Sequence, residues 1–173
     1  MDPMKTLLAL TMLLGVSAPA LAQQTETATA KFENMKGEAN GEANLTGTPV
    51  GVLIEFEVSG LPAGQWVAFH VHETGKCDAA SHHESAGGHF NPTDKEHGYM
   101  SATGPHAGDM PNIYVSEDGI ARAQVLNSQV KLDKSETGIV GRALMIHGGA
   151  DDYKTQPTGD AGDRHACAVI EVN

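Results

Sequence analysis

The sequence has few basic residues, few cysteines and almost no helical signal. Its 173 residues include 11 lysine and arginine residues against 22 aspartate and glutamate residues, which gives a formal net charge of −11. This charge argues against nucleic acid and against an anionic membrane surface as partners. After the N-terminal region, no apolar run approaches the length that spans a bilayer, and there are no internal repeats or low-complexity linkers.

The N-terminal region has the features of a secretory signal peptide. Lys5 provides a positive charge, residues 7–16 are apolar but too few to span a bilayer, and Ala20-Leu21-Ala22 matches a small–x–small cleavage site. We therefore expect residues 1–22 to be removed during export. Residues 23–173 are then expected to form one domain, because this length suits a single hydrophobic core.

The two cysteines, Cys77 and Cys167, both lie in the predicted mature chain. An even number of cysteines in an exported protein predicts one disulfide, and the alternative is a pair of unpaired buried thiols. A disulfide across this separation would contribute roughly 4–5 kcal/mol in the chain-entropy description.

Short strand-like runs between glycine, proline, asparagine and aspartate turns predict an all-β fold, a sandwich or a barrel. The run 51–59 shows the pattern best, because Val52, Ile54, Phe56 and Val58 alternate with other residues. The predicted strands are 27–34, 51–59, 65–72, 112–115, 120–125, 138–147 and 166–172.

Two long segments, 73–108 and 151–163, contain no convincing regular element. A structureless loop of the first length is unusual in a compact domain unless it is functional. Metal ligands and a disulfide at Cys77 would hold such a loop in place, so we interpret both segments as functional loops.

Three histidines and an aspartate lie within residues 87–109, whose sequence is GGHFNPTDKEHGYMSATGPHAGD. Three imidazole nitrogens and one carboxylate oxygen are a complete ligand set for tetrahedral zinc. The predicted zinc ligands are His89, His97, His106 and Asp109.

A second histidine set is typical of copper. His70 and His72 lie on one face of a predicted strand, because side chains alternate along a strand, and His147 ends another strand. An all-imidazole set favours copper(II), which also binds such a site most tightly among the divalent metals. Three imidazoles are one short of the usual four, and His89 would complete the set if its ring bridged the two metals.

These residues stand in motifs that closely resemble the bacterial copper–zinc superoxide dismutases over nearly the whole mature chain. The matching motifs are Phe69-His70-Val71-His72, Ser85-Ala86-Gly87-Gly88-His89-Phe90-Asn91-Pro92, Lys95-Glu96-His97-Gly98, His106-Ala107-Gly108-Asp109, Gly141-Arg142, His147-Gly148-Gly149-Ala150-Asp151-Asp152 and Gly162-Asp163-Arg164-His165-Ala166-Cys167.

The resemblance implies one copper and one zinc ion per subunit, with copper on His70, His72, His89 and His147, and zinc on His89, His97, His106 and Asp109. It also implies a Greek-key β-sandwich or barrel of about eight antiparallel strands, immunoglobulin-like in its arrangement, which is an architecture known for this enzyme. The family disulfide matches Cys77 and Cys167, and the location it implies is the periplasm.

The implied activity is the dismutation of superoxide to oxygen and hydrogen peroxide by alternating reduction and oxidation of copper. Arg164 matches the arginine that holds the anion, and His89 is the expected proton source. Asp151 matches the carboxylate that connects a copper ligand to a zinc ligand, here His70 and His97. Lys154 is expected to steer the anion toward the site, and the assembly is expected to be a homodimer or a monomer.

Two other functions remain open from the sequence. One is a copper-binding or copper-buffering protein with little turnover, and the other is a zinc-only structural protein, which would leave the copper ligands unexplained. The remaining histidines have no transferable role. His82 and His83 are expected to be exposed to solvent, with weak capture of external metal as the alternative. His165 is expected to be structural, with modulation of anion entry by pH as the alternative.

Overall fold

A computed structural model describes residues 26–173, and the predicted signal peptide, residues 1–22, lies outside them. The described chain is built from strands and two short 3₁₀ helices, so the all-β prediction is confirmed. In chain order the elements are β1 Thr27–Asn34, β2 Ala39–Thr48, β3 Gly51–Val58, β4 Gln65–Val67, β5 Phe69–His72, η1 Ala79–Ser81, η2 Glu84–Ala86, β6 Ile113–Val115, β7 Ala121–Asn127, β8 Ala143–His147 and β9 Arg164–Val172.

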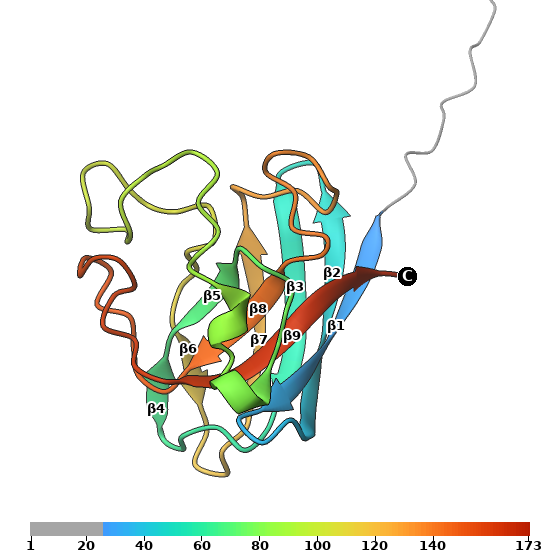
Figure 1. The fold of residues 1–173 in the computed structure, drawn as a ribbon, viewed down its shortest axis with the longest axis vertical. Coiled ribbons are helices and arrows are strands. Elements are labelled where there is room, and N and C mark those ends of the chain that lie inside the picture. The colour runs from blue at the N-terminus through green and yellow to red at the C-terminus, as the bar shows by residue number, and fades with distance from the viewer. Residues whose placement is uncertain (1–25) are drawn as a thin grey trace, which may run out of the picture.

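Seven of the strands form one curled antiparallel sheet in the order β5-β8-β9-β1-β2-β3-β7 (Figure 1). The other two, β4 and β6, pair with each other. Because β4 leads directly into the edge strand β5, and β6 leads through a turn into the opposite edge strand β7, the small ladder connects the two edges. The sheet therefore encloses most of one hydrophobic core.

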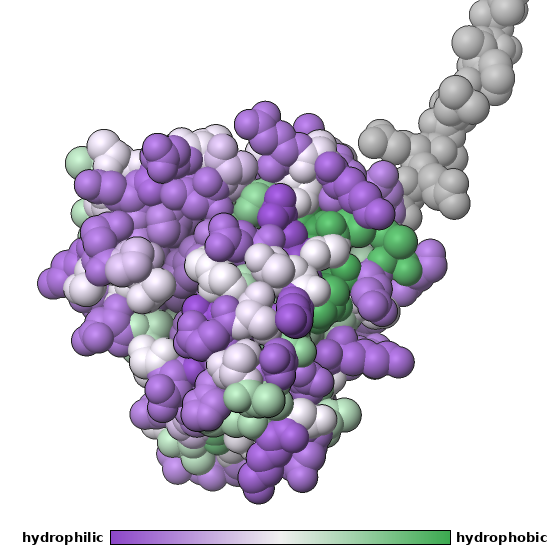
Figure 2. Space-filling model, in the orientation of Figure 1, coloured by the Kyte–Doolittle hydropathy of each residue, from purple (hydrophilic) through white to green (hydrophobic). Residues whose placement is uncertain are grey.

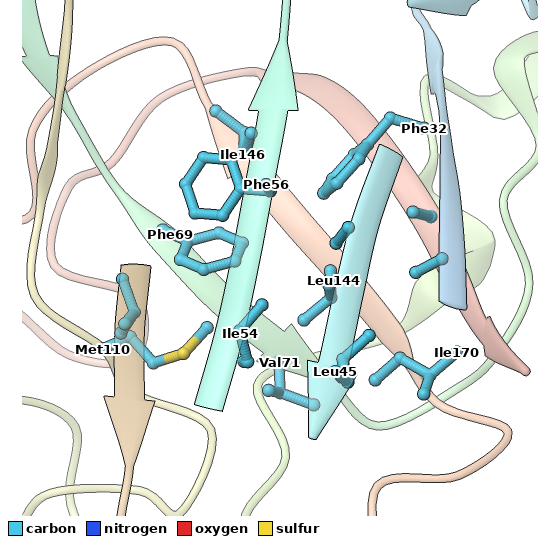
Figure 3. Close-up of a cluster of buried hydrophobic side chains, with 14 of the residues drawn as sticks. Phe32, Leu45, Ile54, Phe56, Phe69, Val71, Met110, Leu144, Ile146 and Ile170 are labelled. Atoms are coloured by element: carbon cyan, nitrogen blue, oxygen red, sulfur yellow. The ribbon is translucent and has the colours of Figure 1, made fainter. Parts of the chain in front are cut away.

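The core follows from alternation along the strands. In β3 the predicted face, Val52, Ile54, Phe56 and Val58, is buried. Figure 3 shows the aromatic and branched side chains from several strands meeting in this interior, where the rings of Phe56 and Phe69 have centroids 4.8 Å apart. Burial of such side chains is the main favourable contribution to folding.

The sequence prediction missed β2. Its sequence, ANGEANLTGT, contains glycine and asparagine, which are depleted in strands and enriched in turns. The segment forms a strand because it pairs with β1 on one side and β3 on the other, although its residues favour turns. Tertiary pairing therefore decides this segment.

The predicted strand 65–72 is interrupted at Ala68. The Ala68 amide donates to the Gly149 carbonyl at 2.8 Å, and the Ala68 carbonyl accepts from the His147 amide at 2.9 Å. The chain therefore leaves the β4–β6 ladder and enters the large sheet at this residue. The predicted strand 138–147 is also shorter, beginning at Ala143, because Gly141 adopts a left-handed conformation with φ 82°.

Both predicted long loops lack strands in the structure, and the first contains only η1 and η2. Cys77 in the first loop forms a disulfide with Cys167 of β9, as predicted. Among residues 26–173 no helix has the length and hydrophobicity to cross a membrane. The face shown in Figure 2 is mainly hydrophilic, with hydrophobic residues gathered on the side where β9 ends.

Candidate metal centre

The strand register places three histidines on the same face of the large sheet. His70 pairs with Met145 and His72 with Ala143 across the β5–β8 ladder, and directly opposed residues project to the same side. Met145 and Ala143 belong to a small cluster separate from the main core. His147 lies two residues beyond Met145, so it projects in the same direction.

The first long loop is held against β5 by backbone hydrogen bonds. The Phe90 amide donates to the Val71 carbonyl at 2.8 Å, and the Val71 amide donates to the Gly108 carbonyl at 2.9 Å. A side chain at Gly108 would collide with the Val71 carbonyl, so only glycine allows this approach. The neighbours of these residues, His89 and Asp109, are therefore delivered to the histidine face.

Two of the copper-set histidines present bare nitrogens to each other. His72 Nδ1 is 2.9 Å from the Gly87 carbonyl oxygen, and His147 Nδ1 is 3.3 Å from that of Gly162. A carbonyl oxygen only accepts, so in each neutral ring Nδ1 carries the hydrogen and Nε2 keeps a lone pair. The two Nε2 atoms are 3.4 Å apart. Lone pairs at this distance repel unless a cation binds both.

The other two copper-set nitrogens, on His70 and His89, have no hydrogen-bond partner among the described residues. His70 Nε2 lies 2.9 Å from the Asp151 carboxylate, which leaves Nδ1 bare. His70 Nδ1 and His89 Nε2 are buried, and neither has a hydrogen-bond partner within residues 26–173. Four buried imidazole nitrogens therefore offer lone pairs that no group in the described part of the chain uses. Such a set fits copper, as the sequence predicted.

The zinc set converges on one oxygen of Asp109. Asp109 Oδ1 lies 2.9 Å from His89 Nδ1, 3.0 Å from His97 Nδ1 and 3.5 Å from His106 Nδ1. Asp109 Oδ2 is instead occupied by the backbone amides of Gly98 and His106, at 2.8 and 3.0 Å. This division leaves three nitrogens and one oxygen facing a common point, a donor set that fits zinc.

His89 belongs to both donor sets. Its Nδ1 faces Asp109 and its Nε2 is the partnerless nitrogen on the copper side. The side chain is 0% exposed, and its ring packs against that of His70 with centroids 4.0 Å apart. The structure thus brings the predicted copper and zinc ligands together as two buried groups that share one imidazole.

Asp151 contacts one histidine of each set. Its Oδ2 lies 2.9 Å from His70 Nε2 and its Oδ1 lies 3.0 Å from His97 Nε2. Asn112 holds the backbone of Asp151 through two hydrogen bonds of 2.8 and 2.9 Å. A side chain at Gly159, where φ is 72°, would collide with the Asp151 carboxylate. Asn112 and Gly159 were missed in the sequence because neither is a metal ligand.

The carboxylates of the centre are held in the ionised form. Burial would raise the pKa of Asp109 and of Asp151, but hydrogen bonds from the surrounding histidines hold the pKa of each carboxyl well below its ordinary value. Burial would lower the pKa of His97, and hydrogen bonds to both carboxylates raise it instead to about 9. Zinc must therefore displace a proton from His97.

The copper-side imidazoles are neutral at physiological pH. Burial lowers the pKa of His70, and it places the pKa of His72 and of His147 well below the ordinary value. Burial, together with the neighbouring His70, lowers the pKa of His89 to about 4. Neutral imidazole is the form that donates a lone pair to a metal.

Arg164, the first residue of β9, lies against the first long loop with its side chain 14% exposed. Its Nη1 donates to the His83 carbonyl and its Nη2 to the Gly87 carbonyl, both at 2.9 Å. The Glu84 carboxylate lies 3.5 Å from Nη2. These partners were not predicted, since a backbone carbonyl acceptor has no signal in the sequence.

Lys154 is exposed in the second long loop. Its amide donates to Asp152 at 3.0 Å, and its backbone packs against Gly98, beside the zinc-set residue His97. His82 is exposed as predicted, but the same prediction is wrong for His83, whose exposure is 0%. His165 is half-buried and packs over Gly148.

Two buried donor sets with a shared imidazole, on a curled antiparallel sheet, define a dinuclear metalloprotein of the copper and zinc class. The chain matches the family described as Copper/zinc superoxide dismutase (SODC) over residues 27–170. It is 49% identical to superoxide dismutase [Cu-Zn] 1 of Aquifex aeolicus over 156 residues, which cover 88% of this chain and 91% of that protein.

Solved structures agree with this match. A superoxide dismutase-like protein from Bacillus subtilis has a TM-score of 0.74 at 36% identity, covering 81% of this chain and 95% of that one. The Cu/Zn superoxide dismutase from Brucella abortus has a TM-score of 0.70 at 28% identity, covering 84% and 100%. This chain belongs to the copper/zinc superoxide dismutase family.

Proposed function

We propose that this chain catalyses the dismutation of superoxide to oxygen and hydrogen peroxide in the periplasm, with one copper and one zinc ion per subunit. The single observation that carries the proposal is His89, a buried imidazole whose two nitrogens each belong to a different metal-binding set. A protein that only stored copper would not need this shared ring.

The seven ligand residues divide the work between the two metals. When bound, copper supplies the one-electron redox chemistry of the reaction, whereas zinc has no redox chemistry. The zinc set holds His89 through Asp109, and Asp151 fixes which ring nitrogen of His70 and His97 faces the metal. Partners of this kind orient metal-binding histidines and keep them in one tautomer.

Arg164 is proposed to bind the superoxide anion. Its guanidinium is anchored to two backbone carbonyls, His83 and Gly87, which leaves the positive charge fixed but not neutralised by a bidentate carboxylate. The Gly87 carbonyl also accepts from His72, a copper ligand, so the guanidinium lies next to the copper set. A fixed positive group beside the redox site holds an anion in place without reorganisation.

His89 is proposed to supply a proton to the reduced product from Nε2. This nitrogen is buried and has no hydrogen-bond partner among the described residues. If Nδ1 were given to zinc, a neutral ring would carry its hydrogen on Nε2. Its Nδ1 remains directed at the Asp109 side while that happens. The ring therefore stays oriented whether or not Nε2 carries the proton.

Local charge explains how an anion reaches a protein of net charge −11. Bound copper(II) and zinc, one imidazolate and the Asp109 carboxylate would sum to about +2 at the centre. The ionised Asp151 would reduce this sum to about +1, and Arg164 adds one positive charge. The exposed Lys154 lies on the loop that packs beside the zinc set. Lys154 is proposed to raise the association rate, because local field rather than net charge steers a substrate.

Activity together with metal content tests the function. The expected result is fast superoxide dismutation in protein that contains one copper and one zinc per chain. Slow turnover at full metal content would favour copper buffering instead. The His89→Ala variant is expected to lose the activity and to retain part of the zinc binding, because His97, His106 and Asp109 remain.

The cellular location and the oligomeric state are separate proposals. Export with removal of residues 1–22 predicts a mature protein that begins at Gln23, which N-terminal sequencing of periplasmic protein measures directly. The assembly is proposed to be a homodimer or a monomer. Trp66 is 57% exposed in the subunit and packs edge-on against Tyr114, so it is not part of the core. Sedimentation of the mature protein distinguishes the two assemblies.

A further inference from the structure

His83 is a buried histidine of the first long loop that the metal chemistry does not use. Its exposure is 0%, although it lies next to the exposed His82. Its ring Nε2 lies 3.1 Å from the carbonyl oxygen of Asn34, the last residue of β1. Its Nδ1 is buried without a hydrogen-bond partner in the part of the chain that the structure describes.

The hydrogen bond to Asn34 fixes the state of the ring. A carbonyl oxygen only accepts, so Nε2 carries the hydrogen and donates it, and the partnerless Nδ1 is bare. Burial also lowers the pKa of His83, in agreement with a neutral ring. The side chain therefore acts as a single directed donor from the loop to the end of β1.

The backbone at this position needs an external contact. His82 has φ 52° and ψ 38°, and His83 has φ 61° and ψ 13°, so two successive residues with side chains are left-handed. This conformation is unfavourable for residues other than glycine. A segment of this kind keeps its shape only when surrounding contacts hold it. The His83 ring provides such a contact.

The carbonyl of the same residue faces Arg164. His83 O accepts from Arg164 Nη1 at 2.9 Å and from the Ala86 amide at 3.0 Å. Asn34 pairs with Ala166 in the β1–β9 ladder, two residues from Arg164. The ring and the carbonyl of His83 thus connect the end of β1 to the guanidinium at the start of β9, across the left-handed turn.

We propose that His83 is a positioning residue for Arg164. Its buried ring, bonded to the Asn34 carbonyl, holds the left-handed turn that aims the His83 carbonyl at Arg164 Nη1. The consequence is a guanidinium whose two terminal nitrogens are both fixed, Nη1 by the His83 carbonyl and Nη2 by the Gly87 carbonyl. This inference rests on the proposed anion-binding role of Arg164.

The test compares two kinds of replacement in protein loaded with copper and zinc. His83→Leu removes the donor and keeps an apolar side chain in the buried space, whereas His83→Gln keeps an N–H that can donate to Asn34. Ser85→Ala is the matched control, because Ser85 donates to the Lys76 carbonyl in the same loop without contacting Arg164. His83→Phe provides a second variant without a donor if His83→Leu does not fold.

The measurement is the dissociation constant of azide, an anion used as a probe of the site, followed through the copper absorption and electron paramagnetic resonance spectra. Loss of the donor is expected to raise this constant about fivefold to tenfold, the size of one hydrogen bond. His83→Gln and Ser85→Ala are expected to stay within about twofold of the parent protein, and the spectra without azide are expected to be unchanged.

Arg164→Gln separates the two proposals. If it leaves azide binding unchanged, the anion-binding role of Arg164 fails and the inference about His83 fails with it. If it weakens azide binding while His83→Leu and His83→Phe do not, only the role of His83 is overturned. In the Arg164→Gln background, His83→Leu is expected to cause no further loss, and an additional loss of similar size contradicts positioning through Arg164.

Discussion

His72 and Arg164 donate to the same atom, the carbonyl oxygen of Gly87, each over 2.9 Å. One is a ligand of the copper set and the other is the proposed anion-binding group. A shared acceptor means that a shift of the loop at Gly87 moves both together. The direction of the copper-facing nitrogen of His72 and the position of Arg164 Nη2 therefore both depend on one backbone atom.

Arg164→Lys is expected to lower the dismutation rate about tenfold at low salt. An ammonium group is a single point and does not match the fork that contacts both carbonyls, so at least one charge-assisted hydrogen bond is lost. The measurement is the second-order rate constant with metal content determined on the same sample. Arg122→Lys, on the exposed face of β7, is the control. Equal rates for the two variants would contradict the role of Arg164.

Glu84→Gln is expected to raise the rate constant by about twofold at low ionic strength. The Glu84 carboxylate lies 3.5 Å from Arg164 Nη2, where it competes with an incoming anion, and it is 70% exposed, so salt screens it. The gain is expected to disappear near about 0.5 M salt. Glu136→Gln, an exposed acid in the turn between β7 and β8, is the matched control. A gain that persists at high salt would point to a cause other than charge.

Lys154→Glu is expected to slow the reaction by about twofold to threefold at low salt, and the difference should narrow as salt rises. The reason is the reversal of an exposed charge on the loop beside the zinc set. Rate constants over a range of ionic strength measure the effect, with Lys134→Glu as the control at a distant exposed position. An unchanged rate constant at low salt would contradict the proposed role of Lys154 in steering superoxide.

Asp151→Asn is expected to weaken zinc binding by about tenfold to a hundredfold, the range seen when such outer partners are removed. The asparagine side chain would place an NH₂ group where one Asp151 oxygen accepts from His70 or His97. Two donors would then face each other, and one histidine would lose the partner that orients its ring. Competition with a chelator of known affinity measures the change. Asp152→Asn is the control, since the Asp152 side chain bonds only to Lys154 and Thr155 among the described residues.

Zinc uptake by metal-free protein, prepared with a chelator, is expected to release a proton from His97. The pKa of His97 is raised to about 9, so the ring is protonated at neutral pH and zinc must replace that proton. Zinc affinity should then rise about tenfold per pH unit up to about pH 9 and level off above it. Calorimetry in two buffers of different ionisation enthalpy counts the protons, and zero release contradicts the prediction.

The raised pKa of His97 also determines how the stability of the metal-free protein changes with pH. A group whose pKa is raised on folding contributes stability that is fully present below its unfolded value and lost as the pH rises through the folded value. For His97 the window runs from 6.5 to about 9. Metal-free protein is therefore expected to lose stability across this window, which denaturant unfolding at several pH values measures.

The metal ligands were predictable because their function depends on side-chain type and on spacing. The strand alternation of His70 and His72 and the loop spacing of His89, His97 and His106 both survive in the structure. The fold class was predictable for a similar reason, since β3 alternates over its whole length. Both signals depend only on residue type and on spacing along the chain, so they can be recognised without the structure.

What was not predictable depends on tertiary contacts. Strand β2 forms from a turn-like sequence because β1 and β3 pair with it on both sides. His83 looks like a surface histidine in sequence, and only the left-handed turn brings its ring under the end of β1. The backbone carbonyl of Gly87 positions the side chains of His72 and Arg164. A backbone acceptor has no signal in the sequence.

The disulfide between Cys77 and Cys167 has a consequence for the order in which the protein matures. Cys167 lies three residues after Arg164 on β9, and Cys77 lies in the loop that carries the carbonyls of His83 and Gly87. Oxidation joins the strand that bears the guanidinium to the loop that bears its acceptors. A chain still in a reducing compartment would lack this link. If the chain is exported as proposed, the proposed anion site is completed only after the chain reaches a compartment where disulfides form.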